Sequence, residues 1–442
     1  MRIVTAGFGL ALMTFVFAGC GGGDDSSLPE LTPFPSPLAE RLHKIRDKVA
    51  EVRELPVYED ITEGTLSSET LRQEGEDALS DLAEEDQADL DATEVALKML
   101  GLIPADYQFG DYVSDTSDQI AGFYAFKEKS LALVGDGTQD LSLSDELVLA
   151  HEYVHSLQDG KFDLVKLTKQ WTETDLEKDG YAQYSITLDC LIEGDATFTA
   201  RKYAEAVYGP DWQTKVQDEE AAGGSIGEAD ESKLPEFLQR DLEFNYGDCA
   251  AFAEGLYKDG GWDAVNAAYE KPPATTEQVL HLDKYKGREL ANVRAPEGLS
   301  DELDDWREVG STQFGEFDVY NFAMTRTQDP QLAIPAAFGW GSGWSRVYRA
   351  PDDAENVVFQ LYLSFDSQQD LIEFLLVFGQ ILAGYGVDPN TLQPGEVIRW
   401  TASGEYGQFG AIILNDKFAD VEIRMATNEE ALLQAVPALK KQ

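Results

Sequence analysis

The sequence predicts an α+β protein: a mainly helical domain with a small N-terminal β-hairpin or sheet, followed by an α+β domain built on an antiparallel sheet. Three observations lead to this prediction. Apolar residues recur at helical spacing in long segments such as 144–157 and 181–207. Two alternating runs flank a polar turn within 120–136. Beyond about residue 300, strand-like alternation dominates.

Residues 1–20 have the pattern of an export signal. Arg2 precedes an apolar run and small residues that end at Cys20, and the run is too short for a stable transmembrane helix. The ending F-A-G-C resembles a bacterial lipobox, which implies a lipoprotein whose Cys20 carries acyl chains such as palmitate. Residues 21–38, rich in Gly, Ser and Pro, would then be a flexible tether to the outer face of the membrane. If the lipobox is not used, the protein is secreted.

The first domain is expected to span residues 39–295. Helical spacing predicts helices at 39–54 and within 66–100, the second region being strongly acidic. The alternating runs around K-E-K then predict the β-hairpin at 120–136.

Longer helical segments follow the hairpin. For the helix at 144–157 we expect Ser144 or Asp145 as the N-cap and an end near Gly160. A second helix is predicted over 181–207. A later segment, NYGDCAAFAEGLYKDGGWDAVNAAYEK, predicts two helices that break at its Gly-Gly pair.

Residues 300–442 are predicted to form a separate α+β accessory domain. Strand-like runs surround one amphipathic helix at 366–386, and another helix closes the chain. We expect an antiparallel sheet with helices on one face. This part of the sequence contains no histidine or cysteine, and its role is not predicted.

The charge balance is strongly acidic. Against 34 Lys and Arg stand 82 Asp and Glu, a formal net charge of −48, which disfavours nucleic acid as a partner. The acidic residues are spread along the chain, which is typical of a solvated acidic surface. The oxygen-rich stretches 111–119 and 136–140 are candidate Ca2+ loops, but neither has EF-hand spacing, so calcium stays unsupported.

The stretch LAHEYVHSLQD holds two of the four histidines of the chain. His151 and His155 lie one helical turn apart, so both imidazoles project from one face and can bind the same ion. H-E-x-x-H on a helix is the zincin metalloprotease pattern, in which Glu152 would be the general base. Two core histidines without a metal are the alternative interpretation.

Catalytic zinc needs a third protein ligand. A nearby histidine is excluded, because Gln158 and Lys161 occupy the positions of Gly and His in the longer H-E-x-x-H-x-x-G-x-x-H motif. Glu193 is the candidate, because it lies on an apolar helical face that should be buried and a buried carboxylate needs a positive partner.

Other assignments of this helix stay open. Glu193 could instead form an ion pair with Arg201 or Lys202, and Asp189 or Asp195 could be the ligand. We expect Asp195 to lie behind the ligands and to orient a ligand imidazole through its distal N–H.

Cys190 and Cys249 remain as an even pair once Cys20 is assigned to lipidation. Export would expose them to an oxidising compartment. A bridge would close a loop of about 60 residues and contribute roughly 4 kcal/mol in the chain-entropy model. The sequence does not decide whether their geometry allows it.

HEYVHSLQD followed by EGDA resembles the gluzincin pattern of metallopeptidases, which is thermolysin-like in its use of two His and one Glu. The stretch from FNYGDC to HLDKY is similar to a poorly characterised group of exported bacterial metallopeptidases that share P-P-x-[ST]-T-E-Q-x-L-H-x-x-K-Y. The resemblance covers roughly residues 105–290. It implies one catalytic Zn2+, a peptide or protein substrate, and an edge strand of the hairpin that pairs with the substrate.

The implied mechanism gives Glu152 the proton of a zinc-activated water, for later delivery to the leaving amine. Another donor should stabilise the carbonyl oxygen as it becomes negative. His281 is the candidate, with Tyr285 and Tyr246 as phenolic alternatives, although no spacing links His281 to the metal. His281 could equally be a turn histidine.

These observations predict a zinc-dependent hydrolase that cleaves peptide bonds at the cell surface. The alternative is a non-catalytic zincin-fold lipoprotein that acts as a binding or adhesion module. The presence of Glu152 favours the enzyme.

Overall fold

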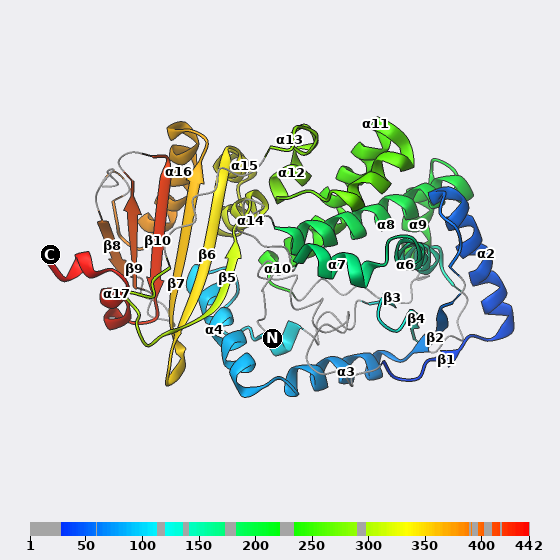
Figure 1. Ribbon diagram of the computed structural model, residues 1–442, viewed down its shortest axis with the longest axis horizontal. Coiled ribbons are helices and arrows are strands. Elements are labelled where there is room, and N and C mark those ends of the chain that lie inside the picture. The colour runs from blue at the N-terminus through cyan, green and yellow to red at the C-terminus, as the bar shows by residue number, and fades with distance from the viewer. Residues whose placement is uncertain are drawn as a thin grey trace.

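The computed structural model describes residues 28–58, 60–112, 120–135, 141–172, 183–221, 234–289, 298–388, 390, 397–401, 409–415 and 418–441. The signal sequence with Cys20, part of the tether and nearly all of the two candidate calcium stretches lie outside these residues. The fold is α+β, as predicted: a small sheet among helices and then a larger sheet (Figure 1). No helix of the described chain has the length and apolarity to cross a bilayer.

The small sheet confirms the predicted hairpin. Its strands, in spatial order, are β1 (Thr32–Pro33), β2 (Thr62–Leu66), β4 (Ser130–Val134) and β3 (Gly122–Ala125). β3 and β4 are antiparallel, whereas β2 and β4 are parallel. Within the described residues, β3 is therefore an edge strand, and it packs against the helix that contains H-E-x-x-H.

The first part of the chain also forms helices, only some of which lie around the small sheet (Figure 1). They are α2 (Ser36–Arg53), α3 (Ser68–Ser80), α4 (Glu84–Leu100), α6 (Leu143–Phe162), α7 (Leu164–Thr172), α8 (Tyr184–Tyr208), α9 (Trp212–Ala221), α10 (Glu236–Tyr246), α11 (Asp248–Glu270), α12 (Thr276–Leu280) and α13 (Leu282–Gly287). The break predicted in the long glycine-containing segment is confirmed, because Gly260 and Gly261 have non-helical backbone angles inside α11.

Helix α6 is longer at both ends than the sequence predicts. Ser142 is the N-cap, and its hydroxyl and the Asp145 carboxylate form a capping box, so the expected cap Ser144 lies inside the helix. Gly160 does not end the helix. A Cβ there would lie 2.7 Å from the ring of Tyr58, so this glycine permits close packing instead of a C-cap.

Among the described residues, the larger sheet has six strands, and all their pairings are antiparallel. In spatial order they are β5 (Arg307–Gln313), β6 (Trp340–Ala350), β7 (Asp353–Phe365), β10 (Asp420–Ala426), β9 (Phe409–Leu414) and β8 (Val397–Thr401). The accompanying helices are α14 (Glu316–Thr327), α15 (Pro330–Ala337), α16 (Gln368–Gly384), α17 (Glu429–Ala435) and the 3-10 helix η2 (Pro437–Lys441).

Both faces of this sheet are covered, whereas the sequence led us to expect helices on one face. Successive residues of a strand point to opposite faces, and Val357 and Val358 accordingly belong to different cores. The core of Val357 contains Phe374 of α16, and the core of Val358 contains Leu432 of α17.

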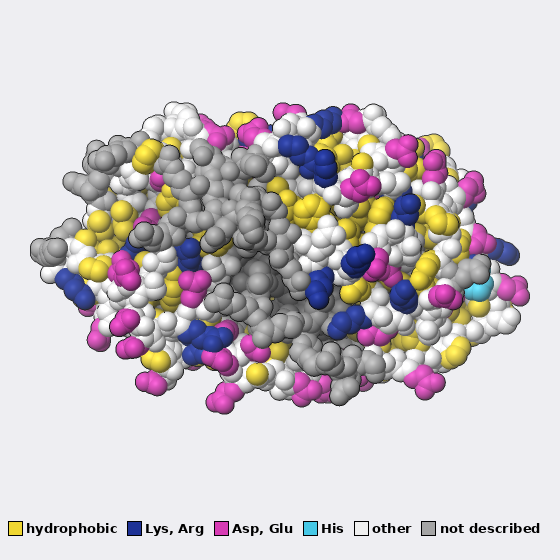
Figure 2. Space-filling model, viewed as in Figure 1, with side chains coloured by type: hydrophobic (Ala, Val, Ile, Leu, Met, Phe, Trp, Pro, Cys, Tyr) yellow, Lys and Arg dark blue, Asp and Glu magenta, His cyan; other side chains and the backbone are white. Residues whose placement is uncertain are grey.

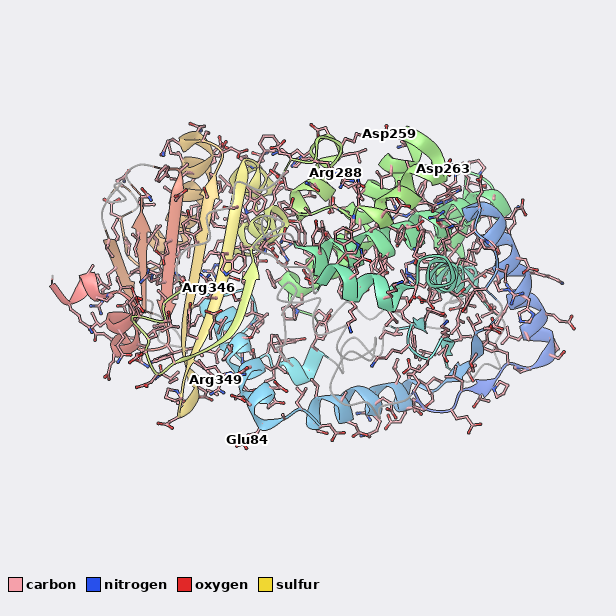
Figure 3. All side chains as sticks on the ribbon, viewed as in Figure 1. Glu84, Asp259, Asp263, Arg288, Arg346 and Arg349 are labelled. Carbon is pink, nitrogen blue, oxygen red and sulfur yellow. A yellow bond between two sulfur atoms is a disulfide. The ribbon has the colours of Figure 1, made fainter. Side chains whose placement is uncertain are left out.

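Helix α4 joins the N-terminal part to the C-terminal sheet. Its apolar residues, among them Leu97, share one core with strands β6 and β7. Asp89 of α4 accepts hydrogen bonds from Arg307 at 2.8 Å and from Arg349 at 2.9 Å. Figure 3 labels Arg349 on β6 beside α4. Residues 300–442 therefore build their core together with a helix from the beginning of the chain.

On the face drawn in Figure 2, the described acidic side chains do not gather in one patch. Figure 2 shows Asp and Glu side chains scattered among Lys and Arg over the described surface. This distribution agrees with a solvated acidic surface on that face.

Candidate metal centre

Helices α6 and α8 bring His151, His155 and Glu193 together. The two Nε2 atoms lie 3.0 Å apart, and the Glu193 oxygens lie 3.1 Å from Nε2 of His151 and 3.4 Å from Nε2 of His155. The ligand atoms of the three residues lie within 4.8 Å of one another, and this group could hold a metal ion.

The spacing fits a small tetrahedral ion. Zinc binds imidazole nitrogen and carboxylate oxygen at about 2.0–2.2 Å, which puts neighbouring ligand atoms of a tetrahedron roughly 3.3 Å apart. The observed separations are 3.0, 3.1 and 3.4 Å. Two imidazole lone pairs that face each other at this distance repel unless a proton or a cation lies between them. The donor set therefore suits a divalent cation.

Electrostatics of the three side chains point the same way. Burial raises the pKa of Glu193, but His155 and His151 outweigh it and hold that pKa below its usual range. Burial lowers the pKa of His155, yet Glu193 outweighs it and raises that pKa to about 9. Without an ion, the carboxylate thus retains a proton on the neighbouring imidazole, and a metal cation would take the place of that proton.

Glu152 lies next to this group on α6. It is only 8% exposed, and burial raises its pKa although His151 and His155 act in the opposite direction. The edge strand β3 lies against it: the backbone of Tyr124 hydrogen-bonds with the carboxylate, and a Cβ on Gly122 would lie 3.7 Å from its Cγ. A buried carboxylate with a raised pKa is suited to taking up a proton.

A disulfide holds α8 against α11 beside Glu193. Cys190 and Cys249 are bonded, with Cα atoms 5.1 Å apart, so the bridge that the sequence left open is confirmed. Gly194 packs so closely that a Cβ would lie 2.2 Å from the carbonyl oxygen of Cys249. The bridge and the glycine together set the position of the backbone that carries Glu193.

Asp195 does not contact an imidazole directly, which corrects its predicted role. Its fully buried carboxylate accepts hydrogen bonds from Arg53, Gln158 and Tyr269. Gln158 in turn contacts Nδ1 of His155 at 2.9 Å. Sequence reasoning used Gln158 only to exclude a nearby third histidine, although its position three residues after His155 places both on one helical face.

The alternative assignments of α8 have other partners in the structure. Arg201 donates to the backbone oxygen of Tyr246 at 2.7 Å, and the Lys202 ammonium lies 4.5 Å from the ring centre of Tyr257. Asp189 lies one turn before Glu193 and outside the three-residue group, and burial together with Glu193 raises its pKa to about 8.

His281 and Tyr285 make their contacts elsewhere. His281 pairs with Glu316 of α14 at 2.9 Å, and the Tyr285 hydroxyl donates to the backbone oxygen of Lys271 at 2.9 Å. His281 is the C-cap of α12, so its contact with Glu316 links this helix to α14. This arrangement favours the interpretation of His281 as a turn histidine and gives neither residue a contact with the metal centre.

Tyr246 is the phenol beside the centre. Its ring centroid lies 6.0 Å from that of His151, and the residue is 49% exposed. Desolvation by the surrounding protein and the charges of Glu193 and Glu152 raise the pKa of this phenol. The hydroxyl therefore keeps its proton and can donate it in a hydrogen bond, while part of the side chain remains open to solvent.

Comparison with known protein families, with curated proteins and with solved structures found no match to this chain.

Proposed function

We propose that this protein is a zinc-dependent peptidase of the gluzincin type. The observation that carries the proposal is the convergence of two imidazoles and one carboxylate beside a second, buried carboxylate. His151, His155 and Glu193 would hold the ion, and Glu152 would be the general base. Two His and one Glu are the ligand set of catalytic zinc in thermolysin-like peptidases.

The bound ion would polarise a carbonyl group and lower the pKa of a coordinated water toward about 7. Glu152 would take a proton from the attacking water and deliver it to the leaving amine. Edge strand β3 would pair with an extended peptide, since its outer backbone groups face away from β4. Tyr246 would donate to the carbonyl oxygen as negative charge develops there.

We further propose that the protein works at the outer face of a membrane, anchored through Cys20. The lipobox-like sequence before the Gly/Ser/Pro-rich tether supports the anchor. The Cys190–Cys249 disulfide supports an oxidising compartment, because structural disulfides are rare in reducing ones.

The test uses residues 21–442, which lack the signal sequence and the lipidated Cys20, and the Glu152→Gln variant of the same chain. We expect one zinc ion per chain in both proteins and cleavage of a peptide library by the unaltered protein alone. General base removal should lower kcat at least about 100-fold. Glu146→Gln is the matched control, because Glu146 is buried on the same helix but bonds to Tyr203, Tyr208 and Arg41.

Two outcomes would contradict the proposal in different ways. If the chain does not bind zinc, the assignment of a metal centre is itself wrong. A chain that binds one zinc ion and cleaves no peptide, across pH and salt, would favour the non-catalytic binding module.

A further inference from the structure

The side-chain amide of Gln158 has a single consistent orientation. Its nitrogen lies 3.0 Å from the carbonyl oxygen of Ile192 and 3.1 Å from the carboxylate of Asp195. Both partners are acceptors, so both amide hydrogens are donated. The amide oxygen is left to face Nδ1 of His155 at 2.9 Å, and this oxygen can only accept.

The tautomer of His155 follows from this orientation. Nδ1 must carry the hydrogen that Gln158 accepts, so in the neutral ring Nε2 carries the lone pair. Nε2 is the atom that lies 3.0 Å from Nε2 of His151 and 3.4 Å from Glu193. Gln158 thus favours the tautomer in which the Nε2 lone pair of His155 can bind an ion.

Arg53 contacts Asp195, which in turn contacts Gln158. Its guanidinium donates to both oxygens of Asp195, at 2.8 and 3.0 Å, although 142 residues separate the two. Both side chains are fully buried. Asn266 accepts a further hydrogen bond from Arg53 at 2.7 Å, and the guanidinium lies 4.4 Å from the ring centre of Trp262.

Removal of Arg53 would leave the Asp195 carboxylate buried without its positive partner. A buried carboxylate without its paired donors is destabilised and must change its contacts or draw in water, and either change alters the acceptor that Gln158 faces. Arg53 is the last residue of α2, so the first long helix of the described chain takes part in arranging a ligand that lies on α6.

We infer that Arg53, Asp195 and Gln158 are positioning residues that select the Nδ1-protonated form of His155 and so raise the metal affinity of the centre. Docking of α2 then becomes a condition for tight metal binding. The inference rests on the metal-binding part of the proposed function, and its tests do not require peptide cleavage.

The first test compares Gln158→Leu with Gln278→Leu. Gln278 is an equally buried glutamine whose amide bonds to Ala274 and Glu289, in the α12 region. Zinc affinity, measured by competition with a chelator, should fall 10–100-fold in Gln158→Leu, the usual effect of losing a group that orients a metal ligand. Gln278→Leu should bind zinc like the unaltered protein. Equal affinity in all three proteins would overturn the inference.

The second test concerns Arg53. Arg53→Met should weaken zinc binding about as much as Gln158→Leu, and Arg53→Lys should restore part of it, because lysine keeps the charge but not the paired donors. Circular dichroism establishes that each variant is folded. Folded Arg53→Met with unchanged zinc affinity would exclude a contribution from α2.

A third measurement needs no variant that might fail to fold. In metal-free protein labelled with 15N-histidine, NMR at a pH where the ring is neutral reports which nitrogen of His155 bears hydrogen, and the chain has only four histidines to assign. The expected signal is a protonated Nδ1. A protonated Nε2 with a bare Nδ1 would contradict the inference, whatever the protein does to peptides.

Discussion

The ring centroids of Tyr246 and His151 lie 6.0 Å apart, although Tyr246 ends α10 and His151 belongs to α6. If its hydroxyl stabilises the developing oxyanion, Tyr246→Phe should lower kcat by about 100–1,000-fold, the usual cost of losing one such donor. Zinc affinity should not change, because the phenol is not a ligand. Steady-state kinetics on one peptide substrate, together with metal analysis, measure both quantities.

The matched controls for Tyr246 are Tyr285→Phe and His281→Gln. Each removes a hydrogen bond in the α12–α13 region, so a modest loss of stability is expected. Their kcat should stay within a few-fold of the unaltered protein. A large loss of kcat in His281→Gln with retained folding would return the oxyanion role to that residue.

Glu193 should be essential for the metal centre, whereas Asp189 should not. Glu193→Ala removes one of three ligands and should weaken zinc binding by more than the 10–100-fold expected for an orienting residue. Asp189→Asn keeps a side chain of similar size on the same helix, and zinc affinity should be retained. The reverse result, with Asp189→Asn losing the metal, would identify Asp189 as the third ligand.

Metal affinity should depend on pH. In the metal-free protein the pKa of His155 is raised to about 9, so below pH 9 the ion must displace a proton. The apparent Kd for zinc should rise about tenfold for each unit as pH falls from 9 to 7, since one proton corresponds to about 1.4 kcal/mol per pH unit. Competition titrations at pH 7, 8 and 9 measure this slope. A constant Kd would show that the two imidazoles and Glu193 do not share a proton.

The disulfide should contribute strongly to stability. Cys190 and Cys249 are 59 residues apart in sequence, and opening a loop of this length costs about 4 kcal/mol in the chain-entropy model. The double variant Cys190→Ala/Cys249→Ala should lower the free energy of unfolding in urea by about this amount. At saturating zinc it should still bind one ion per chain. A decrease below about 1 kcal/mol would mean that the unfolded chain is already restricted in other ways.

The parts of the site that could be predicted are those set by helix geometry. The spacing of His151 and His155 indicates a shared face directly, and the helical phase of Glu193 placed its carboxylate on the face that meets α6, although the side chain is 26% exposed and not buried as expected. Both depend on intervals within one helix. The hairpin and the Gly-Gly break were predicted for the same reason, from patterns a few residues long.

Residues that act across the fold were not predictable in this way. Arg53 contacts Asp195 from α2, and Tyr246, which the sequence named only as a phenolic alternative to His281, lies beside His151 from α10. No local interval relates either residue to the H-E-x-x-H helix. For His281, a rare residue type suggested catalysis, whereas its contact with Glu316 favours a turn histidine. A rare residue type suggests a specific role in the protein. Only tertiary contacts distinguish a catalytic role from a structural contact between two helices.

The place of α4 has a consequence for the order in which the chain can fold. A ribosome completes α4 long before it reaches β6 and β7, with which α4 shares its core. Until those strands emerge, the apolar face of α4 lacks its contacts with the sheet, and Asp89 lacks both Arg307 and Arg349. Contacts between such distant segments slow folding, because a long loop must close before they form. The last third of the chain is therefore required before the first third can finish folding.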